Sequence, residues 1–242
     1  MSPKAKSARI APQPQKARPI VFSGRDGLGA YTVDPTAFPP ERVIYHDDDF
    51  VVINDLYPKS AVHTLVLPRN TERNILHPFD AFEDAAFLEL VKKETANAER
   101  MVAAELRRRY SKFSASDKPR RQAMESEDPP DELPVGRDWS KDVMSGIHAH
   151  PSMNHVHVHV MSRDMYSECM KHRKHYESFN TPFLVPLEAF PLAKDDPRRH
   201  PGKSGYLDQD LKCWRCGKVF GNRHFSKLKA HLETEFEDWK RE

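Results

Sequence analysis

Long hydrophobic runs are missing from this chain of 242 residues. No stretch of about 18 consecutive apolar residues occurs, so we expect no membrane-spanning helix. The N-terminal residues also lack the apolar core of a secretory signal. A mean hydropathy of −0.75 and 20 prolines are typical of a soluble protein with long irregular segments.

Cysteine is scarce and the net charge is small. Three cysteines, Cys169, Cys213 and Cys216, argue against a disulfide framework and favour an intracellular protein. A net charge of +2 creates no overall field for a polyanion, so any nucleic-acid surface must be local. The length suits one substantial domain with a small module.

Composition divides the chain into segments. Residues 1–28 are predicted to be a disordered basic tail, suited to nuclear entry or nucleic-acid contact, or simply solvated. The main domain is expected over residues 29–190, interrupted by a charged, proline-containing surface insertion over 111–141 that is mobile in part. Residues 191–209 are predicted to be a linker, and residues 210–242 a separate module.

The main domain combines strand and helix patterns. A hairpin is expected over Arg42–Asp55, a strand over His63–Pro68, and further strand character within residues 142–162. Asp80 and Glu83 are predicted to cap a long helix. The apolar stripe of this helix consists of Phe87, Leu90, Val91, Met101, Val102 and Leu106. We therefore expect an α+β fold in which an antiparallel sheet has flanking helices.

The C-terminal module has the spacing of a metal site. Cys213 and Cys216 form a C-x-x-C pair, followed after fourteen residues by His231 and then Glu235. Ligands at i and i+4 share one face of a helix, so these four residues suit a tetrahedral structural Zn²⁺. His224 and Glu233 are rivals for the fourth position. A metal-free cap with two free thiols and a redox pair are weaker alternatives, because about 30 residues do not build a core unaided.

Cations surround the predicted zinc ligands. They interleave with Trp214 and Phe225, which favours contact with a phosphate backbone over a plain solvated face. These cations are Lys212, Arg215, Lys218, Arg223, Lys227 and Lys229.

Three histidines alternate with valines in NHVHVHVMS, residues 154–162. In a strand, His155, His157 and His159 share one face. A catalytic metal site is one explanation, but a third histidine two residues further on is awkward for the same ion. If the three histidines were merely exposed on an edge strand, their regular spacing would have no explanation. Nucleophilic catalysis fits better: one neutral imidazole attacks, and a protonated group such as His148 assists the leaving group.

These residues resemble a known family. HVHVHVM is similar to the H-φ-H-φ-H-φ-φ signature of the histidine triad superfamily of nucleotide hydrolases and transferases. DLYPKSAVHTLVLP, GIHAHPSMNHVHVHVMS, KHYESFNTPF and the terminal module resemble the aprataxin family of DNA-repair deadenylases, over roughly residues 43–190 and 210–239. The resemblance implies the histidine triad fold followed by a Cys-Cys-His-Glu zinc finger.

The resemblance also implies an activity. Abortive ligation leaves AMP joined to a DNA 5′-phosphate, and His157 would attack the adenylate phosphorus without any metal. Water would then hydrolyse the His157–AMP intermediate, releasing AMP and 5′-phosphate DNA. His148 would assist the departing phosphate, while His155 and His159 would orient His157 and bind phosphate oxygens.

Binding residues follow from the same resemblance. The expected nucleotide-binding residues are Asp55, Lys59, His63, Ser152 and Met153; the expected DNA contacts are Lys174, His175, Arg215, Lys227 and Lys229. The partner would be 5′-adenylated nicked or broken DNA, with RNA–DNA junctions as a further class. We expect a monomer in the nucleus, with the cytoplasm as a second location.

Three other functions remain open at this point. One is a triad hydrolase of small adenosine nucleotides or phosphoramidates, which would not need the basic module. Another is a DNA-binding zinc-finger protein without catalysis. The third is a metallohydrolase that uses the histidine row itself.

Overall fold

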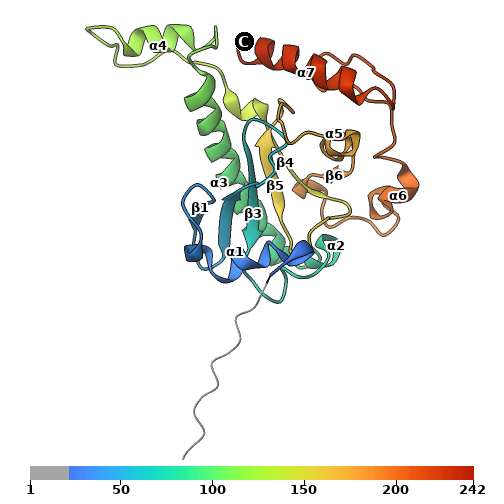
Figure 1. Ribbon diagram of the computed structural model, residues 1–242. Helices are drawn as coiled ribbons and strands as arrows, with labels where there is room; N and C mark the ends of the chain where they lie inside the picture. The colour runs from blue at the N-terminus through green and yellow to red at the C-terminus, as the bar shows by residue number, and fades with distance from the viewer. Residues whose placement is uncertain (1–21) are drawn as a thin grey trace, which may run out of the picture.

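A computed structural model describes residues 22–242 (Figure 1). The strands are β1 (Val43–His46), β2 (Phe50–Asn54), β3 (His63–Pro68), β4 (Val143–His148), β5 (Val158–Ser162) and β6 (Leu184–Val185). The helices are α1 (Gly29–Val33), α2 (Pro78–Ala81), α3 (Ala85–Tyr110), α4 (Lys118–Met124), α5 (Arg173–Asn180), α6 (Pro201–Ser204) and α7 (Phe225–Trp239).

The six strands form one antiparallel sheet in the order β1-β2-β3-β5-β4-β6. β3 lies against β5, with Leu65 opposite His159 and Val66 opposite Val158. Because side chains alternate across a strand, Val66 and Val158 face the main core while His159 faces the other side. The expected α+β class with an antiparallel sheet is confirmed.

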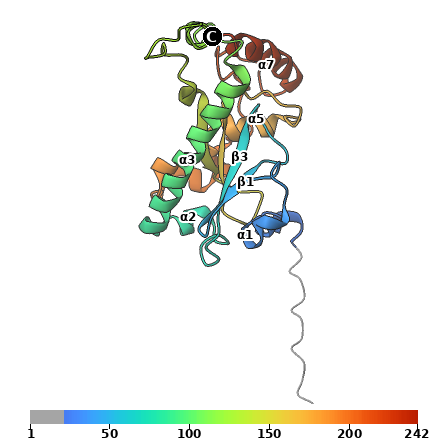
Figure 2. The ribbon, with the colours of Figure 1, turned by 90° about the vertical axis from the view of Figure 1, so that its left-hand side faces the viewer.

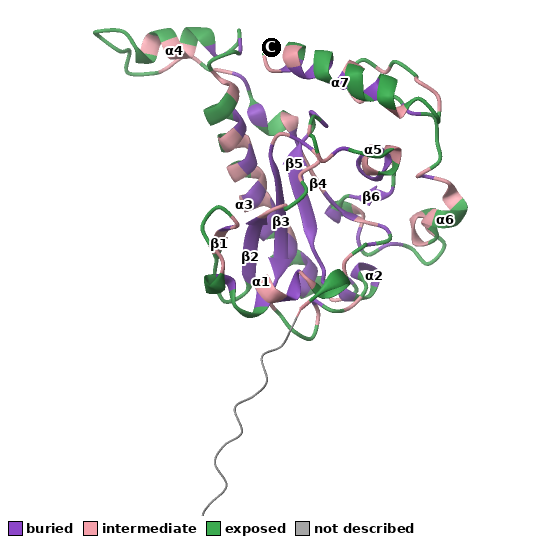
Figure 3. Ribbon diagram, in the orientation of Figure 1, coloured by how far each residue is buried: buried purple, intermediate pink, exposed green. Residues whose placement is uncertain are grey.

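Helix α3 covers the valine face of the sheet (Figures 2 and 3). Its N-cap is Asp84, whose carboxylate accepts a hydrogen bond from the backbone N–H of Phe87 at 3.1 Å. The predicted capping pair of Asp80 and Glu83 is therefore wrong. Asp80 belongs instead to the separate short helix α2, which starts at Pro78 because proline suits the first position of a helix.

Leu90 also departs from the predicted apolar stripe, since it is 50% exposed. The side chains that α3 buries against the sheet include Leu88, Val91 and Val102. The buried stripe thus keeps the helical period but is rotated away from Leu90.

The insertion over residues 111–141 is anchored at both ends. Buried Asp117 accepts hydrogen bonds from the backbone N–H of Arg137 at 3.0 Å and from the indole of Trp139 at 2.9 Å. Trp139 is itself buried in the main core. The ends of the predicted surface insertion are therefore not at the surface, because these buried polar and aromatic groups hold them against the domain.

Two predicted boundaries also shift. Residues 1–21 of the tail expected over 1–28 lie outside the described part. In the remaining part, the backbone carbonyl of Arg25 accepts a hydrogen bond from Asn154 N–H at 2.9 Å. The linker expected over 191–209 buries Leu192 and Tyr206. Both segments pack on the main domain because each contributes apolar or backbone partners to it.

The C-terminal module is firmly docked. The hydroxyl of Tyr176 donates to the carbonyl of Lys212 at 2.8 Å and accepts from Trp214 N–H at 2.9 Å. At the far end of α7, the Trp239 indole donates to Asp142 at 2.7 Å, and the guanidinium of Arg137 lies 5.1 Å from the Trp239 ring centroid. Polar and aromatic contacts at both ends of the C-terminal module therefore hold it against the main domain.

Asp164, two residues after the end of β5, joins two loops. Its carboxylate accepts from the backbone N–H of Ala61 at 3.0 Å and of Tyr166 at 2.8 Å, and it also bonds Ser162 Oγ. We expect Asp164→Ala to lower the free energy of unfolding by roughly 3 kcal/mol, because buried donors lose their acceptor. For a domain of this size that is a fall in Tm of ~10 °C, measurable by thermal unfolding.

The matched variant Asp164→Asn keeps an acceptor but cannot ionise. Burial raises the pKa of Asp164 to about 6, above its unfolded value, so the folded state holds a proton that unfolding releases. Wild-type stability relative to Asp164→Asn should therefore fall as pH rises from about 4 to about 6, by on the order of 2 kcal/mol. The raised pKa of Asp164 would be contradicted if denaturant titrations gave the same difference in stability between wild type and Asp164→Asn at every pH in this window.

Candidate functional site

A cavity of about 910 Å³ opens on the face of the sheet opposite α3. Its wall comes from β3 and β5, from the segment after β2, from the loop before β5 and from α5. Residues from the sequence prediction that line it are Asp55, Lys59, His63, His148, Ser152, Met153, His157, His159, Lys174 and His175. Segments more than 100 residues apart in the chain thus converge on one space.

His157 has a defined orientation. Its Nδ1 lies 2.7 Å from the backbone carbonyl of His155, which can only accept, so Nδ1 carries the proton. The lone pair of Nε2 is therefore free in the cavity. Burial lowers the pKa of His157, and the imidazole is neutral at neutral pH. A neutral, oriented imidazole is the state that a nucleophile requires.

The ring of His155 does not line the cavity. It packs beside Phe22, with ring centroids 6.1 Å apart, and a Cβ on Gly29 would lie 2.7 Å from its Cε1. Val156 lies in the main core together with Val158, so the alternation extends to His155, whose ring is covered by Phe22 and Gly29. His155 acts on His157 through its carbonyl, and its imidazole serves packing.

His63 sets the tautomer of His159. The backbone N–H of Lys59 donates to His63 Nδ1 at 3.0 Å, so in the neutral ring the proton sits on Nε2. That Nε2–H donates to His159 Nδ1 at 2.9 Å, which leaves the proton of His159 on its own Nε2. Burial lowers the pKa of His63 to about 4 and that of His159 well below its usual value. His159, which lines the cavity, therefore carries its N–H group on Nε2, a buried atom without a hydrogen-bond partner among the described residues.

His148 lies in an aromatic setting. Its ring is 4.4 Å from the ring of His159, 4.7 Å from Phe179 and 5.2 Å from Phe183, centroid to centroid. Burial lowers its pKa to about 3. The expectation that His148 is protonated therefore does not hold for the free protein at neutral pH, because these rings exclude water. Nε2 of the neutral His148 has no hydrogen-bond partner within the part of the chain that the structure describes.

Polar groups at the cavity rim complete the site. Asp55 accepts from Tyr57 N–H at 2.7 Å and places Oδ2 3.6 Å from His63 Nε2. The half-buried Lys59 brings an ammonium group whose pKa is lowered by burial. Lys174 and His175 come from α5, at the outer part of the same cavity. The rim thus offers a carboxylate and cations to a phosphorylated ligand.

Several wall residues were not predicted from the sequence. The segment around α1 contributes Arg25, Leu28 and Tyr31, and the segment after α6 contributes Leu207. Arg25 and Leu28 had been assigned to the tail, Leu207 to the linker and Tyr31 to the main domain, and no motif marks any of them. Phe179 could have been suspected, because it lies within the quoted KHYESFNTPF segment, and its ring contacts the rings of His63, His148 and His159.

Asp55, His63 and His159 also converge closely enough to suggest a metal site. However, both nitrogens of His63 already have hydrogen-bond partners, Lys59 N–H and His159 Nδ1. A metal at His63 would have to displace one of them. The pairing of these atoms therefore favours the metal-free chemistry over the metallohydrolase alternative.

In the C-terminal module, ligand atoms of Cys213, Cys216, His231 and Glu235 all lie within 4.8 Å of one another. The imidazole of His224 already has a hydrogen-bond partner, because its Nδ1 lies 2.8 Å from the carbonyl oxygen of Phe220. Two thiols, an imidazole and a carboxylate form a donor set that suits tetrahedral Zn²⁺. The residues present therefore fit the metal, and the group of converging ligand atoms includes Glu235 and neither of its two rivals.

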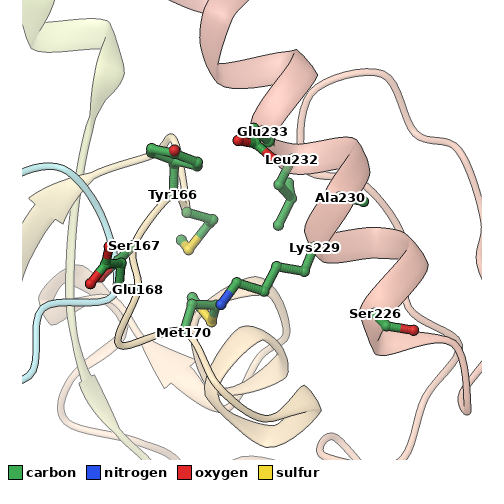
Figure 4. Close-up of a pocket in the computed structure, with 10 residues that line it drawn as sticks. Tyr166, Ser167, Glu168, Met170, Ser226, Lys229, Ala230, Leu232 and Glu233 are labelled. Carbon is green, nitrogen blue, oxygen red and sulfur yellow. The ribbon is translucent and has the colours of Figure 1, made fainter.

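The predicted DNA-contacting cations of this module have different surroundings. Arg215 is engaged by two carboxylates, Glu235 and Glu242, so it is not free for a phosphate. Lys229 lines a second, smaller cavity between α7 and the loop before α5, where its side chain extends toward Met170 (Figure 4). Lys227 is exposed on α7. Lys229 is exposed as well, so both lysines are accessible, unlike the paired Arg215.

Comparison with known proteins agrees with this geometry. Residues 38–166 match the HIT domain family, and residues 180–238 match the C2HE / C2H2 / C2HC zinc-binding finger family. The fold and the histidine site thus define a HIT-domain protein with a C-terminal finger. None of the described helices has the length and hydropathy needed for a membrane span.

Individual relatives narrow the class. The chain is 34% identical to an aprataxin-like protein of Schizosaccharomyces pombe over 97% of this chain and 90% of the relative, and 34% identical to one of Saccharomyces cerevisiae over 89% and 97%. A crystal structure of the aprataxin ortholog Hnt3 in complex with DNA matches with a TM-score of 0.68 at 30% identity, covering 89% of this chain and 96% of that one. The chain belongs to the aprataxin family.

Proposed function

We propose that the protein hydrolyses the 5′-adenylate of abortively ligated DNA through a covalent His157–AMP intermediate. The observation that supports this most is the orientation of His157: its Nδ1–H is held by the His155 carbonyl and its Nε2 lone pair faces the cavity. An imidazole in this state can attack phosphorus directly.

The reaction has two steps. Nε2 of His157 bonds to the adenylate phosphorus, and the bond from that phosphorus to the bridging oxygen breaks, so the DNA leaves with its 5′-phosphate. Water then attacks the same phosphorus, the P–N bond breaks with its electron pair returning to Nε2, and AMP leaves together with the proton lost by water. No oxidant, reductant or metal is needed for either step.

The neighbouring groups stabilise charge on the phosphates. The Nε2–H of His159 would donate to a non-bridging oxygen, as hydrogen-bond donors do in an oxyanion site. Lys59 and the neutral His148 would face the leaving 5′-phosphate, which departs as an anion and needs hydrogen bonds more than a full proton transfer. Asp55 would accept from the ribose hydroxyls, while Ser152 and Met153 line the nucleotide.

DNA binding is part of the proposal. Hnt3, a relative of similar fold, has been crystallised with DNA. On this chain Lys174 and His175 border the cavity, and exposed Lys227 lies on the finger helix. We assign these three residues to DNA binding. Zn²⁺ would stabilise the fold of the finger. Because the substrate is damaged DNA, we expect the protein to act in the nucleus.

AMP release from a 5′-adenylated nicked duplex tests this function. We expect multiple turnovers, with release unchanged after brief treatment with a chelator, because no proposed step uses a metal. A chelator that stops release at once while the catalytic domain stays folded would favour a metal at the triad. Faster cleavage of free adenosine phosphoramidates would favour the small-nucleotide alternative. DNA binding without AMP release would leave a binding protein.

A further inference from the structure

Arg215 lies between the two cysteines of the C-x-x-C pair and is bound to a proposed zinc ligand. Its Nη1 is 2.7 Å from Oε2 of Glu235. The other oxygen of that carboxylate, Oε1, lies 3.0 Å from Nε2 of His231, at the centre of the ligand group. The two oxygens of Glu235 therefore have separate partners: one faces the metal position and the other faces a guanidinium.

The charge of the ligand set explains why such a contact is needed. Two thiolates and a carboxylate bring three negative charges to a divalent ion, so the site with neutral His231 retains one negative charge. Glu235 has only 8% of its side chain exposed, and an unpaired charge in that position is costly. A histidine in the fourth position would leave the site neutral and would not require a cation.

We propose that Arg215 is the residue that makes glutamate a competent fourth zinc ligand in this finger. It neutralises the excess charge and binds the non-coordinating oxygen, so that Glu235 presents one oxygen to the metal. The finger family admits Glu, His or Cys as the fourth ligand, and Arg215 is the feature of this chain that matches the glutamate. The inference rests on the zinc binding proposed above.

The second partner of Arg215 supports this role. Glu242 contacts Nε of the same guanidinium at 3.1 Å and also Nη2, and Glu242 lies 3.5 Å from Arg137. Arg215 is thus held from two sides with 28% of its side chain exposed. A guanidinium fixed in this way presents its fork to a carboxylate at little further entropic cost. Arg215 is a positioning residue for the metal site and not a DNA contact.

A double-mutant cycle on zinc affinity tests the proposal. The full-length protein is titrated with Zn²⁺ against a chromogenic chelator as wild type, Arg215→Gln, Glu235→His and the double variant. We expect Arg215→Gln to weaken zinc binding roughly 10- to 100-fold beside Glu235, as is typical for residues behind a ligand. In the Glu235→His background the same change should cost less than about threefold, since the coupled charge is gone.

Two controls sharpen the test. Arg215→Lys keeps the charge and is expected to stay within about fivefold of wild type, because much of the effect is electrostatic. Arg223→Gln removes an exposed finger cation and should leave zinc affinity unchanged. Equal losses from Arg215→Gln in both backgrounds, or Arg215→Lys as weak as Arg215→Gln, would overturn the proposal. A wild-type protein that binds no zinc would instead overturn the zinc site itself.

Co²⁺ substitution gives a second readout. The visible absorption bands of tetrahedral Co²⁺ report its ligand set directly. We expect Arg215→Gln to shift these bands away from those of the wild type, because Glu235 loses the contact that orients it. Unchanged bands together with unchanged affinity would mean that Glu235 needs no partner.

Discussion

AMP release from 5′-adenylated nicked DNA should fall by on the order of 10⁴-fold or more in His157→Ala, as expected when a nucleophile is removed. Among residues 22–242, only His157 combines a lone pair in the cavity with a proton held on its other nitrogen. The neighbouring His159 presents an N–H group and so does not replace it. Single-turnover assays with quenched samples would measure the rate and the protein-bound AMP together.

His46→Ala is the matched control for this prediction. His46 is exposed at the end of β1 and lies outside the cavity, so its loss should leave the rate within about twofold, as for other surface substitutions. DNA binding should survive in His157→Ala, because the rim residues are unchanged. A variant that keeps more than about a hundredth of the wild-type rate would rule out His157 as the nucleophile.

The histidine row shows how far the sequence leads toward the site. Alternation in NHVHVHVMS correctly separates Val158 and Val160, which face α3, from His157 and His159, which face the cavity. The alternation does not show that the ring of His155 is covered by Phe22 and Gly29 and therefore does not line the cavity. A local period assigns a side chain to one face of a strand, but it does not identify the segment that covers that face.

Long-range contacts account for most of what the sequence did not predict. Asp117 and Trp139 stand in a charged, proline-containing stretch, yet they meet each other and secure it. Leu28 and Leu207 reach the cavity from segments that carry no motif. Each contact joins residues that are distant in sequence or embedded in polar surroundings. Hydrophobic periodicity does not detect such pairs, since it records only neighbours on one element.

The finger was more predictable because its ligands are close in sequence. C-x-x-C followed by a helical i, i+4 pair limits the geometry to a few arrangements, and the structure brings together the four residues that the spacing indicated. The spacing did not show that Arg215, which was predicted to contact DNA, would instead pair with the buried carboxylate of Glu235. Charge alone does not distinguish a cation that faces solvent from one that faces a buried carboxylate.

His63→Ala should lower kcat by roughly 10²- to 10³-fold, the loss typical of removing one donor from an oxyanion site. His63 does not supply that donor itself. Its Nδ1 accepts from the backbone N–H of Lys59, and its Nε2–H donates to Nδ1 of His159, which fixes the His159 proton on Nε2. Without His63 the His159 ring can adopt the other tautomer, in which Nε2 accepts instead of donating.

A double-mutant cycle separates this indirect role from a direct one. If His63 acts only through His159, then His63→Ala combined with His159→Ala should be no slower than His159→Ala alone, since the donor is already absent. Affinity for AMP should change far less than kcat, because the donor matters most as charge develops on the phosphate oxygens. Losses that multiply in the double variant would instead mean that His63 touches the substrate or a metal, and the tautomer mechanism would have to be abandoned.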